Sequence, residues 1–391
     1  MSAIKIIDAA DLKESFYSFH RLEGALEAVP TILEAVRTRG NAAIREYAAK
    51  FDKANPESFE IPKADLKACE DRLRAARPDL YDALCLSRDL ALQFAARQRE
   101  SFDDFEIELS SGLITGQKTI PVERAGLYVP GGRFPLFSSV IMASSPAKAA
   151  GVGDVILCTP PSPHPTDPRL PWADDQILAT ASLCGIDRVF AVGGAQAIAA
   201  MAYGTESIPR VNAIVGPGNK YVAQAKKLVY GEVGIDLLAG PTEVMVIADA
   251  SARPAWVAAD LLAQAEHDAD AEATLITDSR ELALAVQAEL DALVAALPEG
   301  AVARKSLANN SRAVIVRKLD DAIAIANRKA PEHLELAMES GPERDAIERA
   351  ARNYGSLFVG HRTAEVLGDY AAGLNHTLPT SGSALFTGGL S

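Results

Sequence analysis

The segment Arg188-Val-Phe-Ala-Val-Gly-Gly-Ala-Gln196 carries the pattern on which the fold assignment rests. A short apolar, β-branched run ends at two glycines, and an alanine-rich segment follows. An apolar, β-branched run of this length is typical of a short buried strand, and glycine lets the backbone turn sharply where the strand ends. We therefore expect Arg188–Val192 to be a strand that leads through a tight turn into a helix.

The same alternation recurs along the chain from Ile120 onward. The other predicted strands are Ala125–Val129, Asp154–Cys158, Asn212–Val215, Val244–Ala248, Thr274–Thr277, Ala313–Val316 and Ser356–Val359. Strand, crossover helix and strand in succession are typical of a mostly parallel sheet that helices cover on both faces. In open parallel sheets, ligands bind beyond the carboxyl ends of the strands, where the glycine turns are expected.

Helical periodicity dominates the rest of the chain. Apolar residues recur at three- and four-residue spacings in long segments, which are Leu22–Ala48, Lys63–Arg97, Pro254–His267 and Glu281–Ala296. This spacing places the apolar side chains on one face of a helix. A chain of 391 residues that combines these helices with the predicted strands is long enough for two domains with their own cores.

Composition and charge exclude several classes of protein. The net charge of −13 disfavours nonspecific binding to nucleic acid or to an anionic membrane. The chain has no run of about 18 apolar residues and no signal-type start, so we expect a cytoplasmic protein with a small-molecule partner. The cysteines form no CxxC pair, and we expect buried free thiols at Cys69, Cys85, Cys158 and Cys184.

The motif Gln264-Ala-Glu-His267 lies at the end of a predicted amphipathic helix. The three-residue spacing puts Gln264 and His267 on one face, where both can touch one ion. Imidazole is a good zinc ligand, whereas a neutral amide is an uncommon one. The alternative is a solvated helix end.

The motif Ala330-Pro-Glu-His-Leu334 brings a carboxylate and an imidazole together. Pro331 discourages a continuous helix and holds the next two residues near a turn. Glu332 and His333 have different reference pKa values, about 4.3 and 6.5, which suit two separate proton transfers. The alternative is an ordinary surface pair.

The segment Gly368–His376 presents a third constellation, with two glycines, one carboxylate and one imidazole. Asp369 offers a hard oxygen ligand that would complement His267 at a divalent ion. The alternative for Asp369 is a cap or a turn. His20, His164 and His361 have no supporting neighbours, and we assign them no role.

The candidate cofactor residues follow the glycine turns rather than a strict GxGxxG motif, which the chain lacks. Asn219 begins a helical stretch after Gly-Pro-Gly, so free amides and the helix dipole could face an anion there. Tyr128 ends a predicted strand and could stack on a ring, although core packing is the alternative.

Seven motifs follow one another along the chain, namely Gly126-Leu-Tyr-Val-Pro-Gly-Gly132, Val192-Gly-Gly-Ala-Gln196, Gly216-Pro-Gly-Asn-Lys-Tyr221, Asp236-Leu-Leu-Ala-Gly-Pro-Thr-Glu243, Gln264-Ala-Glu-His267, Ala330-Pro-Glu-His-Leu334 and Gly368-Asp-Tyr370. Taken in order, these motifs resemble the histidinol dehydrogenase family from roughly residue 25 to the last residue.

The resemblance, with the alternating pattern, implies an α/β fold with two incomplete Rossmann-like domains, mostly parallel sheets and flanking helices. The expected divisions are a helical N-terminal segment over 1–29, a discontinuous α/β domain over 30–127 and 242–380 with the zinc and acid-base residues, an NAD-binding domain over 128–241, and the start of a tail over 381–391.

The resemblance also implies roles for single residues. Tyr128, Gln196 and Asn219 match NAD-contacting positions. The matching zinc ligands are Gln264, His267 and Asp369, which also lie at the substrate. Glu332 and His333 match the acid-base pair, whereas Thr242 and His376, together with His333, match positions that contact substrate.

The reaction that this implies is the oxidation of an amino alcohol, through an enzyme-held aldehyde, to a carboxylic acid, with two NAD reduced in turn. His333 would take the alcohol proton and Glu332 would activate the water that hydrates the aldehyde. Zinc would mainly hold and orient the nitrogen atoms of the substrate. The resemblance implies a homodimer as well.

Two departures from the family pattern leave the substrate open. The sequence ends at Ser391, where family members continue into a tail that supplies a fourth zinc ligand and a glutamate, and Phe134 stands where a small residue is common. Three hypotheses follow: histidinol dehydrogenase itself; a zinc and NAD paralogue that oxidises another alcohol, such as a sulfonated diol bound by Arg133 or Lys220; and a non-catalytic metal- or nucleotide-binding protein.

Overall fold

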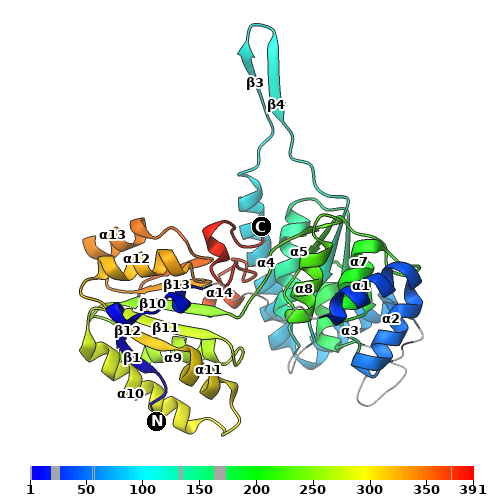
Figure 1. The fold of residues 1–391 in the computed structure, drawn as a ribbon. Helices are drawn as coiled ribbons and strands as arrows, with labels where there is room; N and C mark the ends of the chain where they lie inside the picture. The colour runs from blue at the N-terminus through cyan, green and yellow to red at the C-terminus, as the bar shows by residue number, and fades with distance from the viewer. Residues whose placement is uncertain are drawn as a thin grey trace. The chain divides into compact units, whose positions relative to one another are not determined.

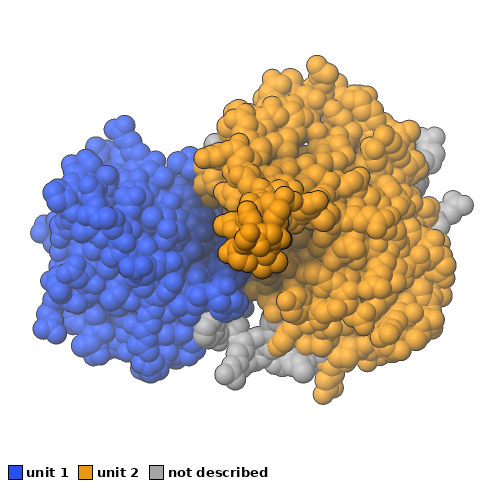
Figure 2. Space-filling view, turned by 90° about the horizontal axis from the view of Figure 1, so that it is seen from above, with its two compact units in different colours: residues 1–23, 239–369, 378–389 blue, residues 24–238, 370–377, 390–391 orange. Residues whose placement is uncertain are grey.

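The computed structural model describes residues 2–18, 27–54, 56, 58–131, 135–162, 173–370 and 372–391. The chain divides into two compact units, which Figure 2 colours separately. Unit 1 comprises residues 1–23, 239–369 and 378–389, and unit 2 comprises residues 24–238, 370–377 and 390–391. Each unit is built around its own sheet.

The sheet of unit 1 consists of six parallel strands within the described residues, in the order β1-β12-β11-β10-β13-β14. The strands are β1 Lys5–Asp8, β10 Glu243–Ala248, β11 Glu272–Thr277, β12 Arg312–Ile315, β13 His333–Ala337 and β14 Ser356–Val359. Every residue of β10, β11 and β13 is buried. Strands that are buried on both faces are expected where helices cover a parallel sheet.

Helices cover both faces of this sheet (Figure 1). One apolar cluster joins the strands to α9 Pro254–Ala265, α10 Arg280–Ala296 and α11 Val302–Asn310. A second cluster, on the opposite face, contains side chains of α12 Leu319–Lys329 and α13 Pro342–Ala350. The short helix α14, Leu367–Tyr370, follows β14 along the chain.

The sheet of unit 2 has the order β2-β7-β6-β5-β8-β9, and within the described residues only β2 runs antiparallel to its neighbour. The strands are β2 Glu60–Ile61, β5 Arg124–Tyr128, β6 Asp154–Thr159, β7 Arg188–Ala191, β8 Ala213–Val215 and β9 Gly234–Ile235. Two apolar clusters again pack helices on the sheet. The first includes α1 Ala28–Arg39, α2 Asn41–Tyr47, α7 Gly194–Tyr203 and α8 Lys220–Val229, and the second α3 Lys63–Ala76, α4 Pro78–Arg99, α5 Phe137–Ala149 and α6 Asp175–Leu183.

Unit 2 also carries a two-stranded antiparallel hairpin that no sequence pattern had predicted, β3 Phe105–Ser110 with β4 Leu113–Gln117. All of its strand residues are exposed. In Figure 1 the hairpin stands clear of the other elements of unit 2. Its exposed large apolar side chains are Phe105, Ile107, Leu109, Leu113 and Ile114.

The α/β class with mostly parallel sheets is confirmed, but the predicted helical segment over 1–29 is wrong in its described part. Residues 5–8 form β1, which pairs in parallel with β12 at the edge of the sheet. The pairing satisfies backbone groups of Lys5–Asp8, and the neighbouring Ile4 enters the core. Residues 19–26 lie outside the described part, and α1 begins at Ala28.

The two units differ from the expected domain boundaries. Residues 30–127 were expected to join 242–380, whereas the structure places 24–238 together in unit 2. β2 adds to the edge of the unit 2 sheet beside β7. Helices α1 and α3 bury their apolar faces in the same cores as β5–β7. Local periodicity predicts these helices but not the sheet against which they pack.

The cysteines are free thiols in the structure, as predicted. Cys69, Cys158 and Cys184 are buried, whereas Cys85 is half-buried. Burial raises the pKa of the Cys184 thiol to about 11, so it is not a thiolate nucleophile at neutral pH. Separately, none of the described helices is long and apolar enough to cross a membrane.

Candidate active site

The acid-base candidates lie at the amino-terminal ends of the parallel strands of the unit 1 sheet. His333 is the first residue of β13 and pairs in register with Val244 of β10. Glu243, the first residue of β10, pairs with Glu272 of β11. These ends are opposite to the carboxyl-terminal ends of the strands, where the sequence pattern had predicted ligand binding.

The local sequence brings Glu332 and His333 to these strand ends. Helix α12 ends at Lys329, and Ala330 follows in the left-handed conformation with φ 54°, which is uncommon for a residue with a Cβ. Beyond Pro331 the chain enters β13 directly, and the carbonyl of Glu332 accepts a hydrogen bond from Ser356 N at 2.9 Å. The predicted break at the proline is present, but a strand that had not been predicted follows it.

The backbone of Glu243 holds both side chains of the pair. Its N–H donates to Glu332 Oε2 at 3.0 Å, and its carbonyl oxygen lies 3.1 Å from His333 Nδ1. Because a carbonyl only accepts, Nδ1 carries the proton, and Nε2 is the basic nitrogen of the neutral ring. Glu332 and His333 are both buried, with Nδ1 and Oε2 3.8 Å apart.

The surroundings of Glu332 favour its protonated form. Burial is the main cause that raises the pKa of Glu332 well above its ordinary value, and the nearby carboxylates of Glu243, Asp369 and Glu365 raise it further. The N–H of Glu243 acts in the opposite direction, because it stabilises the carboxylate. A carboxyl group with a raised pKa is a stronger base, and its carboxylate form can accept and return a proton.

Gln264 is the metal candidate with the clearest structural signal. Its side chain is buried, and its Nε2 donates to Thr242 Oγ1. Its Oε1 is also buried and has no hydrogen-bond partner among the described residues. An unpaired buried oxygen is costly unless another group satisfies it, so a cation at Oε1 fits the site.

His267 and Asp369 are the other two metal candidates. Helix α9 ends at Ala265, two residues earlier than predicted, and His267 follows in a turn with its Nδ1 3.0 Å from Ala263 O. This contact leaves Nε2 as the nitrogen for a metal. Asp369 lies in α14 and is half-buried. No group of three His, Cys, Asp or Glu side chains with metal-binding placement occurs in the described part, so the set depends on the amide of Gln264.

Sequence reasoning missed two buried acids of unit 1, Glu335 and Glu365, and the half-buried Asp260. Glu365 is buried, its Oε1 has no partner among the described residues, and burial together with Asp369 raises its pKa to about 8. Burial is also the main reason why the pKa of Asp260 rises to about 6 and that of Glu335 well above its ordinary value. No motif marked these residues, although Glu335 follows His333 by two residues and therefore shares its side of β13.

Unit 2 contains a pocket of about 740 Å³ at the carboxyl ends of β5, β6, β7 and β8. This is where a parallel sheet is expected to bind a ligand. Tyr128, Gln196 and Asn219 all line it, so the structure brings the three NAD candidates to one cavity. Asp52 lines it too, 3.4 Å from Gln196 Nε2, and burial raises the pKa of Asp52 to about 6.

The three pocket residues are held by specific contacts. The Tyr128 ring is buried in the core, and its hydroxyl accepts from Gly194 N at 3.0 Å. Gly194 has φ 65°, and a Cβ there would lie 2.9 Å from Gln196 Oε1. Asn219 caps α8, and its Oδ1 accepts from Tyr221 N and Val222 N. Two of the amides that had been expected to face an anion are therefore already bonded.

The contacts of His376 and Lys220 do not indicate a ligand. His376 belongs to unit 2, where its Nε2 lies 3.3 Å from Ser138 Oγ. Lys220 is exposed, with its Nζ 5.7 Å from the Tyr221 ring centroid. Arg133 and Phe134, with His20 and His164, lie outside the described residues.

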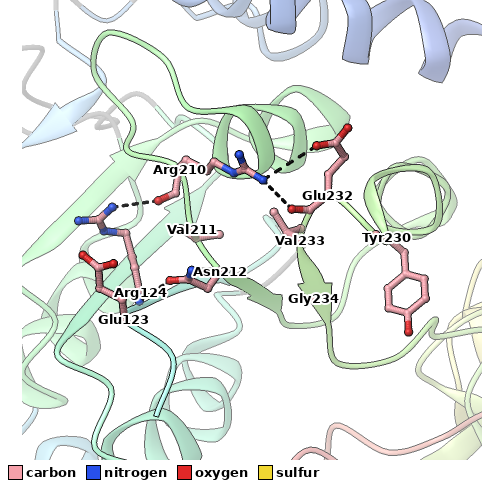
Figure 3. A pocket seen from close by; sticks show the side chains of 10 residues that line it. Glu123, Arg124, Arg210, Val211, Asn212, Tyr230, Glu232, Val233 and Gly234 are labelled. Atoms are coloured by element: carbon pink, nitrogen blue, oxygen red, sulfur yellow. Dashed lines mark hydrogen bonds and ion pairs between the residues drawn. The ribbon is translucent and has the colours of Figure 1, made fainter. Parts of the chain in front are cut away.

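A second hollow of unit 2, about 710 Å³, lies at the opposite edge of the sheet, near the amino ends of β5 and β8 (Figure 3). Three of its four charged residues, Arg124, Arg210 and Glu232, already make contacts with one another. Arg210 donates to Glu232 O at 2.8 Å and lies 3.9 Å from Glu232 Oε2, while Arg124 donates to Arg210 O at 2.9 Å. These contacts make the hollow a weaker ligand site than the pocket at the carboxyl edge.

Comparisons with known proteins agree with the motif pattern. The histidinol dehydrogenase family profile matches residues 18–391. The histidinol dehydrogenase of Aromatoleum aromaticum is 46% identical over 364 residues, which are 92% of this chain and 80% of that protein. That of Streptococcus mutans is 44% identical over 93% of this chain and 81% of the relative.

A solved structure shows the same fold. The crystal structure of histidinol dehydrogenase from Elizabethkingia anophelis matches with a TM-score of 0.90 and 34% identity, covering 100% of this chain and 88% of that one. These findings support the first of the three hypotheses drawn from the sequence, and not the sulfonated diol or the non-catalytic alternative.

Proposed function

Because the chain belongs to the histidinol dehydrogenase family, we propose that it oxidises L-histidinol through L-histidinal to L-histidine and reduces two NAD. The observation that carries the proposal is the buried pair Glu332 and His333, which the backbone of Glu243 holds at the amino-terminal ends of β10 and β13. Two bases with different surroundings suit two successive oxidations.

His333 acts in the first oxidation. NAD supplies the hydride acceptor when it is bound, and Tyr128, Gln196 and Asn219 would hold it. The neutral imidazole takes the hydroxyl proton of the alcohol at Nε2 while the carbon that carries this hydroxyl loses its hydride. The Glu243 carbonyl then stabilises the imidazolium through Nδ1–H.

Glu332 acts in the second oxidation. Its carboxylate takes a proton from the water that adds to the aldehyde carbon and returns it to the carbonyl oxygen, which completes the hydrate. A second bound NAD would supply the acceptor for the hydride of that hydrate. The hydrogen bond from Glu243 N keeps Oε2 in place throughout. Thr242 and His376 remain proposed substrate contacts.

Zinc is proposed as the resident metal, held by Gln264, His267 and Asp369. When it is bound, the ion supplies a positive charge that holds and orients the substrate nitrogen atoms. The unpaired Gln264 Oε1 supports this assignment.

The Gln264→Ala variant tests the metal assignment. We expect zinc affinity to fall by about 100-fold, because the change removes a ligand whose buried oxygen has no protein partner. Competition with a chromophoric chelator measures the affinity, and Gln93→Ala, at an exposed position of α4, is the matched control. Equal zinc affinities in the two variants would remove Gln264 from the ligand set.

The direct test of the activity follows NADH absorbance in a mixture of purified zinc-loaded protein, NAD and L-histidinol. We expect NADH to form with L-histidinol and much more slowly with a panel of other small alcohols, sulfonated diols included. A folded, zinc-loaded and NAD-binding sample that forms no NADH from L-histidinol would contradict the proposal.

A homodimer is proposed on the evidence of the β3–β4 hairpin. A two-stranded hairpin without a packed face is marginally stable in water, and its unpaired edges invite pairing with another chain. Phe105 and Ile107 lie on one face by the alternation of strand residues, and both are about half exposed, at 52% and 51%. A second copy of the chain would cover this apolar face.

The Phe105→Glu/Ile107→Glu variant tests the dimer. Light scattering is expected to give twice the chain mass of 41.4 kDa for the unmodified protein and the single mass for the variant, because charges oppose burial of this face. Leu284→Glu, on an exposed position of α10, should leave the dimer intact. A dimeric hairpin variant would rule out the hairpin as the interface.

A further inference from the structure

A buried ionic cluster lies beside the acid-base pair in unit 1. Lys329 Nζ is 2.8 Å from Glu272 Oε2 and 3.5 Å from Glu243 Oε1. All three side chains are at least nine-tenths buried, with exposures of 5%, 6% and 2% for Lys329, Glu272 and Glu243. The ring of Phe16 covers the ammonium group, with its centroid 5.2 Å from Nζ.

Lys329 is the close cation for both carboxylates. Arg312 is the other nearby base, but it lies 3.9 Å from Glu272 Oε1 and forms no ion pair with Glu243 in the described part of the chain. Neither carboxylate oxygen of Glu243 has a hydrogen-bond partner among the described residues. Burial raises the pKa of Glu243 to about 7, and Lys329 is the main group that lowers it, with a smaller effect from the backbone of Ser381. The ion pair with Lys329 is therefore the main support for a charged Glu243, because buried carboxylates require a compensating cation.

The cluster closes a ring of contacts around the catalytic segment. Lys329 is the last residue of α12, and three residues later the chain reaches Glu332. The side chain of Lys329 contacts Glu243, and the backbone of Glu243 in turn contacts Glu332 and His333. The segment from 329 to 333 is therefore tied to Glu243 at both ends of the segment. The ion pair holds the end at Lys329, and the backbone contacts of Glu243 hold the end at Glu332 and His333.

We infer that Lys329 is a positioning residue for the acid-base pair: by pairing with Glu243 it fixes the backbone group that holds Glu332 and His333. The expected fall in kcat rests on the proposed function, whereas the contacts of Lys329 with Glu243 and of Glu243 with the pair do not. Misplacement of a catalytic group by about 1 Å can cost on the order of 100-fold in rate. Loss of Lys329 should therefore lower kcat more than it changes KM.

The kinetic test compares Lys329→Met, Glu243→Gln and the double variant. We expect Lys329→Met to lower kcat by about 100-fold, with the KM for NAD changed less than about threefold, because it leaves a buried carboxylate unpaired beside the site. The double variant removes that charge while Glu272 keeps Arg312, so its kcat should return to that of Glu243→Gln. Lys318→Met, at an exposed lysine before α12, should match the unmodified protein.

Two results would overturn the inference: a folded Lys329→Met with unchanged kcat, or a double variant whose kcat is much lower than that of Glu243→Gln. If Lys329→Met fails to fold, the comparison of the double variant with Glu243→Gln decides, because a folded double variant with a much lower kcat than Glu243→Gln also contradicts the inference.

A second readout does not depend on turnover. In protein labelled with ¹⁵N-histidine, the Nδ1–H signal of His333 is identified by its absence in His333→Ala. We expect this signal to shift or broaden in Lys329→Met and to return in the double variant. An unchanged signal in Lys329→Met contradicts the inference even if the protein does not oxidise histidinol, whereas inactivity of the unmodified protein contradicts only the proposed function.

Discussion

Replacing His333 by alanine is expected to lower the rate of NADH formation from L-histidinol by roughly 1,000-fold, because a positioned general base contributes about 10²- to 10⁴-fold. The imidazole is the only base that the proposal assigns to the alcohol proton, and its Nε2 is directed to this role by the contact of Nδ1 with Glu243 O. Stopped-flow absorbance of the first hydride transfer measures the effect.

Supplying L-histidinal to the same variant separates His333 from general damage to the site. The aldehyde bypasses the first oxidation, so its conversion to L-histidine should fall far less than that of L-histidinol. Equal loss with both substrates would contradict a role confined to the first step. His361→Ala, at a half-buried histidine beside Ser251, serves as the matched control.

Replacing Glu332 by glutamine is expected to slow aldehyde oxidation by roughly 100-fold or more and to leave the first hydride transfer much less affected. The amide keeps the size of the side chain and can still accept from Glu243 N, but it cannot take a proton from water. Single-turnover measurements with L-histidinal and with L-histidinol distinguish the two steps. Equal loss of both would contradict the division of labour.

The pH dependence of aldehyde oxidation provides a further check on Glu332. Its pKa is raised mainly by burial, and only the carboxylate form can accept a proton. The rate of aldehyde oxidation should therefore rise with pH through this raised pKa in the unmodified protein. The Glu332→Gln variant should lack that rise; an identical rise in the variant would assign it to another group.

The regular strands could be predicted from the sequence because their apolar runs are uninterrupted. β6, β7 and β10 each read as buried apolar segments with β-branched residues, and they end at or near glycine or polar residues. β13 was missed because its sequence, His333-Leu-Glu-Leu-Ala337, places polar side chains in a strand that is buried throughout. The site chemistry itself disrupts the apolar pattern that normally identifies a central strand.

The contacts that organise the site have no signature in the sequence. Glu243 was recognised as part of a motif, but it acts on Glu332 and His333 through its backbone, which any residue could supply. The pairing of Lys329 with Glu272 joins residues 57 positions apart. Such contacts depend on strand order, and strand order was not deducible from local periodicity.

Spacing and turn position marked several of the NAD and metal candidates, but their roles were assigned by resemblance. Tyr128 ends β5, whereas Gln196 lies in α7 and Asn219 caps α8, and only the parallel sheet brings them to one pocket. Gln264 was an unpromising ligand on chemical grounds, because amides rarely bind zinc. Its unpaired buried oxygen, visible only in the folded chain, is what supports the assignment.

The number of NADH molecules formed for each L-histidinol consumed tests the central claim most directly, namely that one site performs two oxidations through Glu332 and His333. With zinc-loaded protein and excess NAD, the account predicts two NADH for each L-histidinol and L-histidine as the product. One NADH for each L-histidinol with the aldehyde as the final product, or no NADH at all, would contradict it.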